Sequence, residues 1–485
     1  MTLQTMLGFR VLVSGALIAI CLGGCSGGAP SRPKADGGTG AATGTGGRSG
    51  GDGGGGTGGA TGSGGTTDNG GNAGTGSGGR AATGTGGAVE IGGGIGTGGR
   101  SGAGGAGAVG GALARGGASG AVGAAGGSGG AAICIAGIYD QYVLRTDGIA
   151  LFEPSANNEH VILDTTTGLS LRGITEIQGG SSHGCALLGN GSVACWQTAT
   201  NGNGAGQLGN GTTTPNSVVY RSTTVLIAPN TPLTNVLALA TGGESNNAVN
   251  TACAVTRDGK LWCWGDLTWI VNKGTPLPSP YAQAITTDGL TALTGVVQAT
   301  FARTGACAVV NGTPNSVWCW GDNAASELAQ GDMVNRQYPV KVLELSAPTK
   351  VVMTDSYYDN NTICVLDAGE VRCWGSNNHG TVGINSTTTP ITAPMLVVLQ
   401  NGSTVLGGVS DIEPGSAAIS ALRTDGTLWN WGYGLNKYAG NYGLTNIVSI
   451  ADAGGYSTDG PRFLTSDGVY HHGMTPISVN CGALQ

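Results

Sequence analysis

Eight of the twelve cysteines fall into four pairs, and cysteines spaced in this way can form disulfides. The two members of each pair are 9 to 12 residues apart and flank a short polar segment. Zinc is the alternative, but its ligands usually follow a Cys-x₂₋₄-Cys spacing, which does not occur among these eight. We therefore expect the disulfides Cys185–Cys195, Cys253–Cys263, Cys307–Cys319 and Cys364–Cys373.

The segment between paired cysteines is typical of the turn of a β-hairpin. Asp-Gly or Asn-Gly between apolar runs is a strong hairpin signal, and the glycine supplies a left-handed backbone. A three-residue loop ending at Gly259 places Cys253 opposite Cys263, where a disulfide is within reach. In the sixth copy of the pattern, Ser420 and Asn430 replace both cysteines together, as expected of residues that act as a pair.

The hairpin pattern recurs seven times, with a Trp in most copies, which indicates a repeat protein. The spacing between successive turn glycines ranges from 42 to 68 residues. An all-β repeat of about 50 residues is typical of a propeller built from four-stranded blades. The turn glycines are Gly148, Gly191, Gly259, Gly312, Gly369, Gly426 and Gly468.

These repeats resemble the regulator of chromosome condensation repeat family, whose unit has an Ala-Leu strand, an Asp-Gly turn, a Trp-Gly and a Gly-x-Leu-Gly loop. Gly206–Gly211 supplies that loop in the second repeat and Gly380–Gly383 in the fifth, whereas Ser326–Ala329 departs from it in the fourth. The resemblance implies an all-β, seven-bladed β-propeller over residues 133–485. It says little about function, because one fold serves unrelated tasks.

The N-terminus resembles that of a bacterial lipoprotein. The apolar run Val11–Leu22 is too short to span a membrane but has the length of a signal-peptide core. The sequence Leu22-Gly23-Gly24-Cys25 resembles a lipobox, which implies that residues 1–24 are removed and that Cys25 is lipidated. The alternative is an ordinary signal peptide near which Cys25 merely lies. Ser26 resembles an outer-membrane sorting context, so we expect an extracytoplasmic lipoprotein of the outer membrane or cell surface.

Residues 25–132 are expected to form a disordered Gly/Ala/Thr-rich tether between the lipid and the propeller. Such a composition cannot bury enough apolar area to offset the entropy of ordering, and glycine does not recur strictly every third residue as in collagen. A Gly-rich coil of this length reaches roughly 60 Å. A low-complexity segment without a selected role is the alternative.

Charge excludes one class of partner. The residues after Ala132 contain 14 Lys/Arg and 24 Asp/Glu. A domain this acidic lacks the basic footprint that nucleic acid requires, and anionic lipid would repel it. Membrane attachment is therefore expected only through the lipid.

Apart from Cys21 in the predicted signal peptide and the predicted lipidation site Cys25, two cysteines remain beyond the four hairpin pairs, Cys134 and Cys481. They stand near the two ends of the predicted propeller, and the first and last blades of a closed ring are neighbours. We therefore expect a fifth disulfide, Cys134–Cys481, across the seam. The alternative is that both thiols are free or bind elsewhere.

No sequence pattern predicts catalysis, a metal site or a cofactor. Gly180–Gly184 matches Gly-x-Ser-x-Gly, but that elbow needs an α/β sheet and here it precedes a hairpin strand. The pair His471-His472 falls where other repeats place Cys-Trp and is expected to belong to a blade. We therefore expect no enzyme.

The favoured hypothesis is a monomeric protein-binding module that contacts an unknown protein partner through its loops. Aromatic and amide-rich insertions are the candidate contact residues: Trp269, Tyr281, Tyr357, Tyr358 and Asp359. Ordinary solvent-facing loop residues are the alternative. The rival hypothesis is an extracellular enzyme acting on polysaccharide or another envelope substrate through paired carboxylates such as Asp355 and Asp359.

Overall fold

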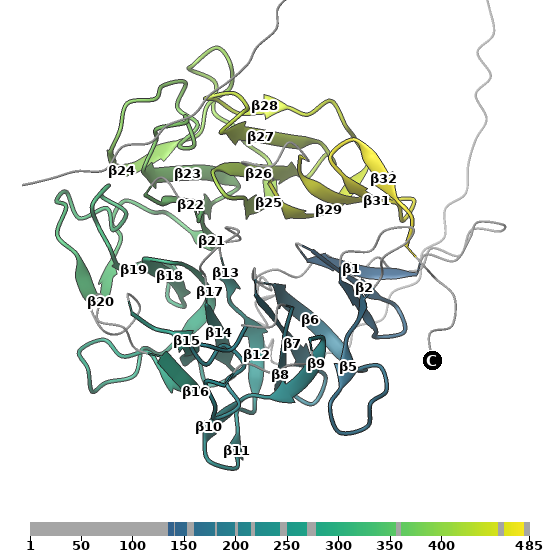
Figure 1. The fold of residues 1–485 in the computed structure, drawn as a ribbon. Coiled ribbons are helices and arrows are strands. Elements are labelled where there is room, and N and C mark those ends of the chain that lie inside the picture. Colours follow the sequence, from purple (N-terminus) through teal and green to yellow (C-terminus); the bar gives the residue numbers. More distant parts are fainter. Residues whose placement is uncertain are drawn as a thin grey trace, which may run out of the picture. The chain divides into compact units, whose positions relative to one another are not determined.

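The computed structural model describes ten segments of the chain, and within them β-strands are the regular secondary structure and no helix occurs. The strands form seven sheets of four or five strands and one two-stranded hairpin. This confirms the expected all-β, seven-bladed β-propeller (Figure 1). The described segments are 134–139, 141–152, 160–179, 182–198, 202–214, 219–242, 250–268, 278–355, 360–453 and 460–479.

The blades follow one another along the chain, and the four main strands of each blade pair in chain order from the inner edge outwards. Blade 1 contains β1 (Ile135–Tyr139), β2 (Tyr142–Arg145), β3 (Ala150–Phe152) and β4 (His160–Val161). Blade 2 contains β6 (Ile174–Gly179), β7 (His183–Leu188), β8 (Val193–Gln197) and β9 (Arg221–Thr224), with β5 (Leu163–Asp164) added at its outer edge. Blade 3 contains β12 (Val236–Leu239), β14 (Thr251–Thr256), β15 (Leu261–Asp266) and β16 (Pro278–Ala284).

The remaining blades repeat this order. Blade 4 contains β17 (Val296–Ala302), β18 (Gly305–Val310), β19 (Ser316–Gly321) and β20 (Arg336–Lys341), with β13 (Thr241–Gly242) pairing on β17. Blade 5 contains β21 (Pro348–Met353), β22 (Thr362–Asp367), β23 (Glu370–Gly375) and β24 (Ile391–Leu396). Blade 6 contains β25 (Val409–Pro414), β26 (Ala418–Arg423), β27 (Leu428–Gly432) and β28 (Gly440–Asn441). Blade 7 contains β29 (Ile447–Asp452), β30 (Arg462–Thr465), β31 (Tyr470–His472) and β32 (Thr475–Ile477), and the separate hairpin is β10 (Leu226–Ala228) with β11 (Thr231–Pro232).

The turn between the second and third strands sets the register of each blade. Six of the seven predicted turn glycines have positive φ, between 77° and 82°, which a residue with a Cβ adopts only at a cost. Gly312 does not have a positive φ. The turn of blade 4 is a longer loop, from Asn311 to Asn315, which can reverse the chain without a left-handed residue at this position. The cysteines of each predicted pair are register partners in these hairpins.

The apolar core is divided among the interfaces between blades. The described residues form seven hydrophobic clusters, and each joins two neighbouring blades. In blades 2 to 6 the third strand contributes a fully buried indole to the interface with the preceding blade. These are Trp196, Trp264, Trp320, Trp374 and Trp431.

The Gly-x-Leu-Gly loop of one blade receives the tryptophan of the next. Trp264 Nε1 donates to the Gln207 carbonyl at 2.9 Å, and Trp431 Nε1 donates to the Thr381 carbonyl at 2.8 Å. A Cβ on Gly209 would lie 2.9 Å from the Trp264 ring, so the close approach of loop and indole requires glycine there. Blade 4 places Ala329 at the corresponding position, also at positive φ.

The ring closes by side-chain packing between blades 1 and 7, whose inner strands β1 and β29 are in contact (Figure 1). All strands of blade 1 come from the N-terminal side of the fold, and all strands of blade 7 come from the C-terminal side. Ile135, Ile138 and Val143 pack against Leu464 and Tyr470 across this seam.

The two histidines of blade 7 lie in β31, one position from the expected alignment. His472 is the register partner of Arg462 and takes the cysteine position of the other hairpins. His471 stacks on Phe463 with ring centroids 4.8 Å apart. The expectation that this pair replaces Cys-Trp is therefore wrong by one residue: the cysteine position is the fourth after the turn glycine, as Cys263 is after Gly259, and this is His472 after Gly468.

The predicted signal peptide (1–24) and tether (25–132) lie outside the described residues, as does residue 133 of the predicted propeller domain. In the part of the chain that is described, no helix has the length and apolar character needed to cross a membrane.

Candidate functional site at the loop end of the propeller

The strand order gives the propeller two different ends. Connections between the first and second strands and between the third and fourth strands emerge at one end, which we call the loop end. The Asp-Gly turns and the connections between blades emerge at the other, which we call the turn end.

Buried asparagines organise the third-to-fourth-strand loops. Asn203 Oδ1 accepts from the Leu208 amide at 3.0 Å, while its Nδ2 donates to the carbonyl of Thr212 at 3.1 Å. Asn323 and Asn377 form the same kind of contacts in blades 4 and 5. Each of these asparagines therefore satisfies several backbone groups of its own loop at once.

Exposed apolar side chains gather at the loop end. Five of the nine exposed large apolar residues of the described chain lie in third-to-fourth-strand loops: Met333, Val334, Tyr433, Leu435 and Met474. Tyr433 is 38% exposed and Leu435 is 42% exposed. The Tyr433 ring contacts His379 of blade 5 edge-on at 4.7 Å. We call His379, Tyr433 and Leu435 the loop-end patch.

A buried ion cluster joins the inner strands of blades 5 and 6. Lys350 Nζ, on β21, lies 2.7 Å from Asp411 Oδ1 and 2.6 Å from Glu413 Oε1, both on β25. Burial raises the pKa of Glu413 to about 7; Lys350 opposes this shift, and nearby Asp411 and Asp452 add to it. Burial disfavours the Lys350 ammonium, but its two carboxylate partners outweigh this and raise its pKa. The cluster links blades and leaves Lys350 engaged, so it does not have the free groups of a catalytic site.

Glu327 is a second buried acid, in the Ser326–Ala329 loop of blade 4. Its Oε2 accepts from the Ala325 amide at 2.8 Å, whereas its buried Oε1 has no hydrogen-bond partner. Burial raises the pKa of Glu327 to about 7, and the charge of Asp322 adds to the shift. In blade 2 the corresponding residue is Gln207, whose amide donates to Asn250 Oδ1 at 2.9 Å.

The contacts of Ser182 do not support a nucleophile elbow. Ser182 Oγ donates to Asn250 Oδ1 at 3.2 Å, and no described histidine lies in this contact. His183 is fully buried in β7, and burial lowers its pKa to about 4, so the imidazole is neutral at physiological pH. Asp355 is buried and accepts from the Arg303 amide, while Asp359 lies outside the described residues.

Only one of the predicted contact residues is described. Tyr281 lies in strand β16 rather than in a loop, half-buried, with its hydroxyl 2.8 Å from where a Cβ on Gly211 would stand. The structure thus brings Tyr281 to the interface of blades 2 and 3, which sequence order alone does not show. The others lie outside the described residues: Trp269, Tyr357, Tyr358 and Asp359.

The cysteines that the structure describes are engaged in disulfides. The four expected hairpin bridges are present, with Cα atoms 4.0 to 4.1 Å apart. Cys134 is also disulfide-bonded. Cys25 and Cys481 lie outside the described residues, so lipidation and the closing bridge stay predictions. In the described segments, no group of three or more His, Cys, Asp or Glu side chains could hold a metal ion.

Sequence reasoning missed the loop asparagines and the ion cluster. The asparagines had a readable signal, since Asn323 and Asn377 each follow a Trp-Gly by one intervening residue. Lys350 and Glu413 had a weaker one: each is a charged residue among apolar ones, in the segment that precedes a predicted hairpin.

Comparison with known proteins supports the class of fold, although no protein-family model matches the chain. The chain is 25% identical over 271 residues to the human E3 ubiquitin-protein ligase HERC2, covering 55% of this chain and 5% of the ligase. It is 26% identical over 131 residues to the mitochondrial RCC1 domain-containing protein RUG3 of Arabidopsis thaliana, covering 27% of this chain and 28% of that protein. It therefore spans only a small part of these relatives.

Among solved structures, Prp20p of Saccharomyces cerevisiae, the yeast RCC1, aligns with a TM-score of 0.46 at 16% identity, over 61% of this chain and 70% of that one. The repeats, the seven blades and the curated relatives together support an RCC1-like seven-bladed β-propeller.

Proposed function

We propose that this chain is a protein-interaction module held at the bacterial cell envelope by a lipid on Cys25. The loop-end patch carries the proposal: Tyr433 and Leu435 are exposed on the third-to-fourth-strand loop of blade 6, and the Tyr433 ring packs on His379 in the blade 5 loop that Asn377 organises. Binding residues are commonly placed on loops of a rigid scaffold in this way. The propeller contributes shape and contact area, and no described residue is assigned a catalytic role.

The anchoring half of the proposal rests on the lipobox-like residues and on the disulfides. Four disulfides fit an oxidising compartment and would be unusual in a bacterial cytoplasm. In cells of a double-membraned bacterium, Cys25→Ala is expected to move the protein from the membrane fraction to soluble or uncleaved form. A variant that stays in the membrane fraction after signal cleavage would contradict the lipid anchor.

The binding half is tested with the full chain as bait in cell-envelope extract. A double variant, Tyr433→Ser with Leu435→Ser, alters the loop-end patch, and Leu290→Ser is the matched control because Leu290 is 92% exposed in a connection at the turn end. We expect one envelope protein that is recovered by the wild-type chain and the control and lost with the double variant. Recovery of the same partner by all three baits would remove the loop-end patch from the proposal.

A further inference from the structure

A second surface feature is an open pocket at the outer rim between blades 5 and 6. It has a volume of about 510 Å³, within the range of small-molecule sites, ~300–1,000 Å³. The connection from blade 5 to blade 6 forms one wall through Leu399, Gln400 and Asn401. The third and fourth strands of blade 6, with the residues just before β28, form the other.

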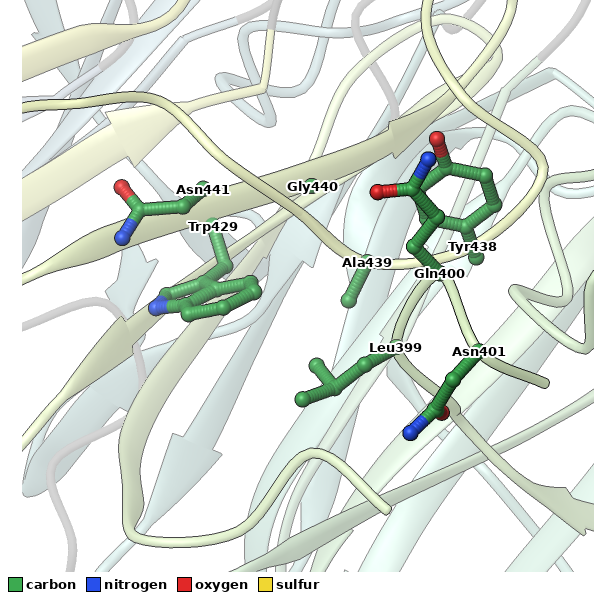
Figure 2. A pocket seen from close by; sticks show the side chains of 8 residues that line it. All are labelled: Leu399, Gln400, Asn401, Trp429, Tyr438, Ala439, Gly440 and Asn441. Carbon is green, nitrogen blue, oxygen red and sulfur yellow. The ribbon is translucent and has the colours of Figure 1, made fainter. Parts of the chain in front are cut away.

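Trp429 presents an aromatic surface to this pocket (Figure 2). Strand alternation turns Trp429 and Trp431 toward blade 5, but only Trp431 is fully buried, and Trp429 stays half-buried at the rim. The Trp429 Nε1 donates to Thr427 Oγ1 at 3.1 Å, which fixes the plane of the ring. Tyr438 and Gln400 lie across the pocket from Trp429, with Leu399 and Ala439 between them (Figure 2).

Neutral hydrogen-bonding groups surround the aromatic surface. The backbone amides of Ser403 and Thr404 donate to Asn401 Oδ1 at 3.1 and 2.9 Å, and Asn401 Nδ2 donates to Thr404 Oγ1 at 2.6 Å. That amide is held in one orientation, with one Nδ2 hydrogen left for a ligand. Asn441 Oδ1 accepts from the Gly443 amide at 2.7 Å, which leaves its two Nδ2 hydrogens available.

The charge and hydrogen-bonding state of the lining limit the class of ligand. Within the described chain, the Gln400 amide and the Tyr438 hydroxyl form no hydrogen bond with another protein group. No carboxylate, ammonium or guanidinium group is among the described lining residues. An anion or a cation would lack a countercharge here. A pyranose ring fits, since its polarised C–H bonds can lie on the negative face of an indole while its hydroxyls meet amides at the edge.

Two other blades place a tryptophan at the position of Trp429 but surround it differently. Trp429 pairs in register with Asn441 of β28, whereas Trp318 of blade 4 pairs with Lys341 of β20. The Trp318 indole is fixed in the same way, by donation from Nε1 to Ser316 Oγ at 3.1 Å. Trp262 of blade 3 pairs with Ala284 of β16. The indole is therefore a repeated feature of the blade, and of these three tryptophans only Trp429 has an amide side chain as its register partner.

We propose that this pocket binds a neutral sugar unit of a glycan, stacked on Trp429 and hydrogen-bonded by Gln400, Asn401 and Asn441. The site shares no residue with the loop-end patch, although Tyr438 stands in the same blade 6 loop as Tyr433 and Leu435. The function it adds is attachment to, or recognition of, a neutral polysaccharide.

Titration calorimetry of the full chain with cellohexaose, maltohexaose and chitohexaose tests this proposal. We expect one of these neutral hexasaccharides to bind, and Trp429→Ala and Asn441→Ala each to weaken that binding at least ~10-fold, whereas Trp429→Phe retains part of it. Trp318→Ala is the matched control and is expected to bind as the wild type does. Because Asn441 is exposed, its variant reports on binding even if removal of the half-buried Trp429 disturbs folding.

Three results would overturn the proposal. The first is no heat of binding with any of the three oligosaccharides at millimolar concentration. The second is equal weakening by Trp318→Ala and Trp429→Ala. The third is Trp429-dependent binding of hexagalacturonate or decaproline in place of the neutral sugars, since these probes represent an acidic glycan and a proline-rich peptide. Recovery of the same protein partner by the wild type and the loop-end double variant, with intact sugar binding, would contradict only the proposed interaction function.

Discussion

The sixth blade offers a direct test of how the hairpin disulfides stabilise this propeller. Ser420 and Asn430 are register partners on β26 and β27, as the cysteines are in blades 2 to 5. They are 0% and 4% exposed, and Ser420 Oγ and Asn430 Nδ2 have no hydrogen-bond partner. The double variant Ser420→Cys with Asn430→Cys is therefore expected to form a fifth hairpin disulfide without a change of backbone.

The expected gain has two sources. A bridge over this separation, the same as the 10 residues in blades 2 and 3, contributes about 2.5–3 kcal/mol in the loop-entropy model. Removal of two buried polar atoms without partners adds roughly 1–3 kcal/mol each, less the cost of altered packing. A control double variant, Ser420→Ala with Asn430→Ala, contains only the second effect.

Denaturant unfolding followed by fluorescence of the buried tryptophans measures both variants, and a thiol count on the unfolded chain shows whether the bridge has formed. Reduction is not a usable control, because it would also break the native disulfides. We expect the cysteine variant to exceed the alanine variant by about 2–3 kcal/mol. Two free thiols in the folded cysteine variant would refute the register argument, and a bridged variant no more stable than the alanine control would refute the energetic one.

Three further predictions concern buried groups and the seam. Glu327→Gln should stabilise the protein at pH 8 and leave its stability nearly unchanged at pH 4. The pKa of Glu327 is raised from 4.5 to about 7 in the folded protein, so the wild type loses up to about 3 kcal/mol of stability as pH rises through this range, and the glutamine variant does not. Denaturant unfolding at both pH values checks this, with a parallel pH profile for variant and wild type as the contrary result. Lys350→Met should cost about 3–5 kcal/mol at pH 8 but less at pH 5, where Glu413 can take up a proton, and an equal loss at both pH values would speak against it. The secreted protein should show no reactive thiol at Cys134 or Cys481, and mass-spectrometric detection of both as free thiols would rule out the closing bridge.

Local turn chemistry explains why so much of the fold could be predicted. A hairpin is specified within about a dozen residues, so the Gly259 turn is enough to place Cys253 opposite Cys263, and repetition of that unit gives the number of blades. His471 and His472 were misaligned although the turn at Gly468 is intact, because this terminal copy has no cysteine or tryptophan to mark the register.

Contacts between blades could not be predicted in the same way. Lys350 and Glu413 are 63 residues apart and meet only because two inner strands are neighbours around the ring. Trp429 and Trp431 are two positions apart on one strand and turn the same way, yet only Trp431 is fully buried. The hairpins, their disulfides and the number of blades could be predicted because each depends on residues close in the chain. Which side chains join two blades, which acids are buried and where an aromatic ring stays open to a ligand became visible only in the folded molecule, because burial depends on the neighbouring blade.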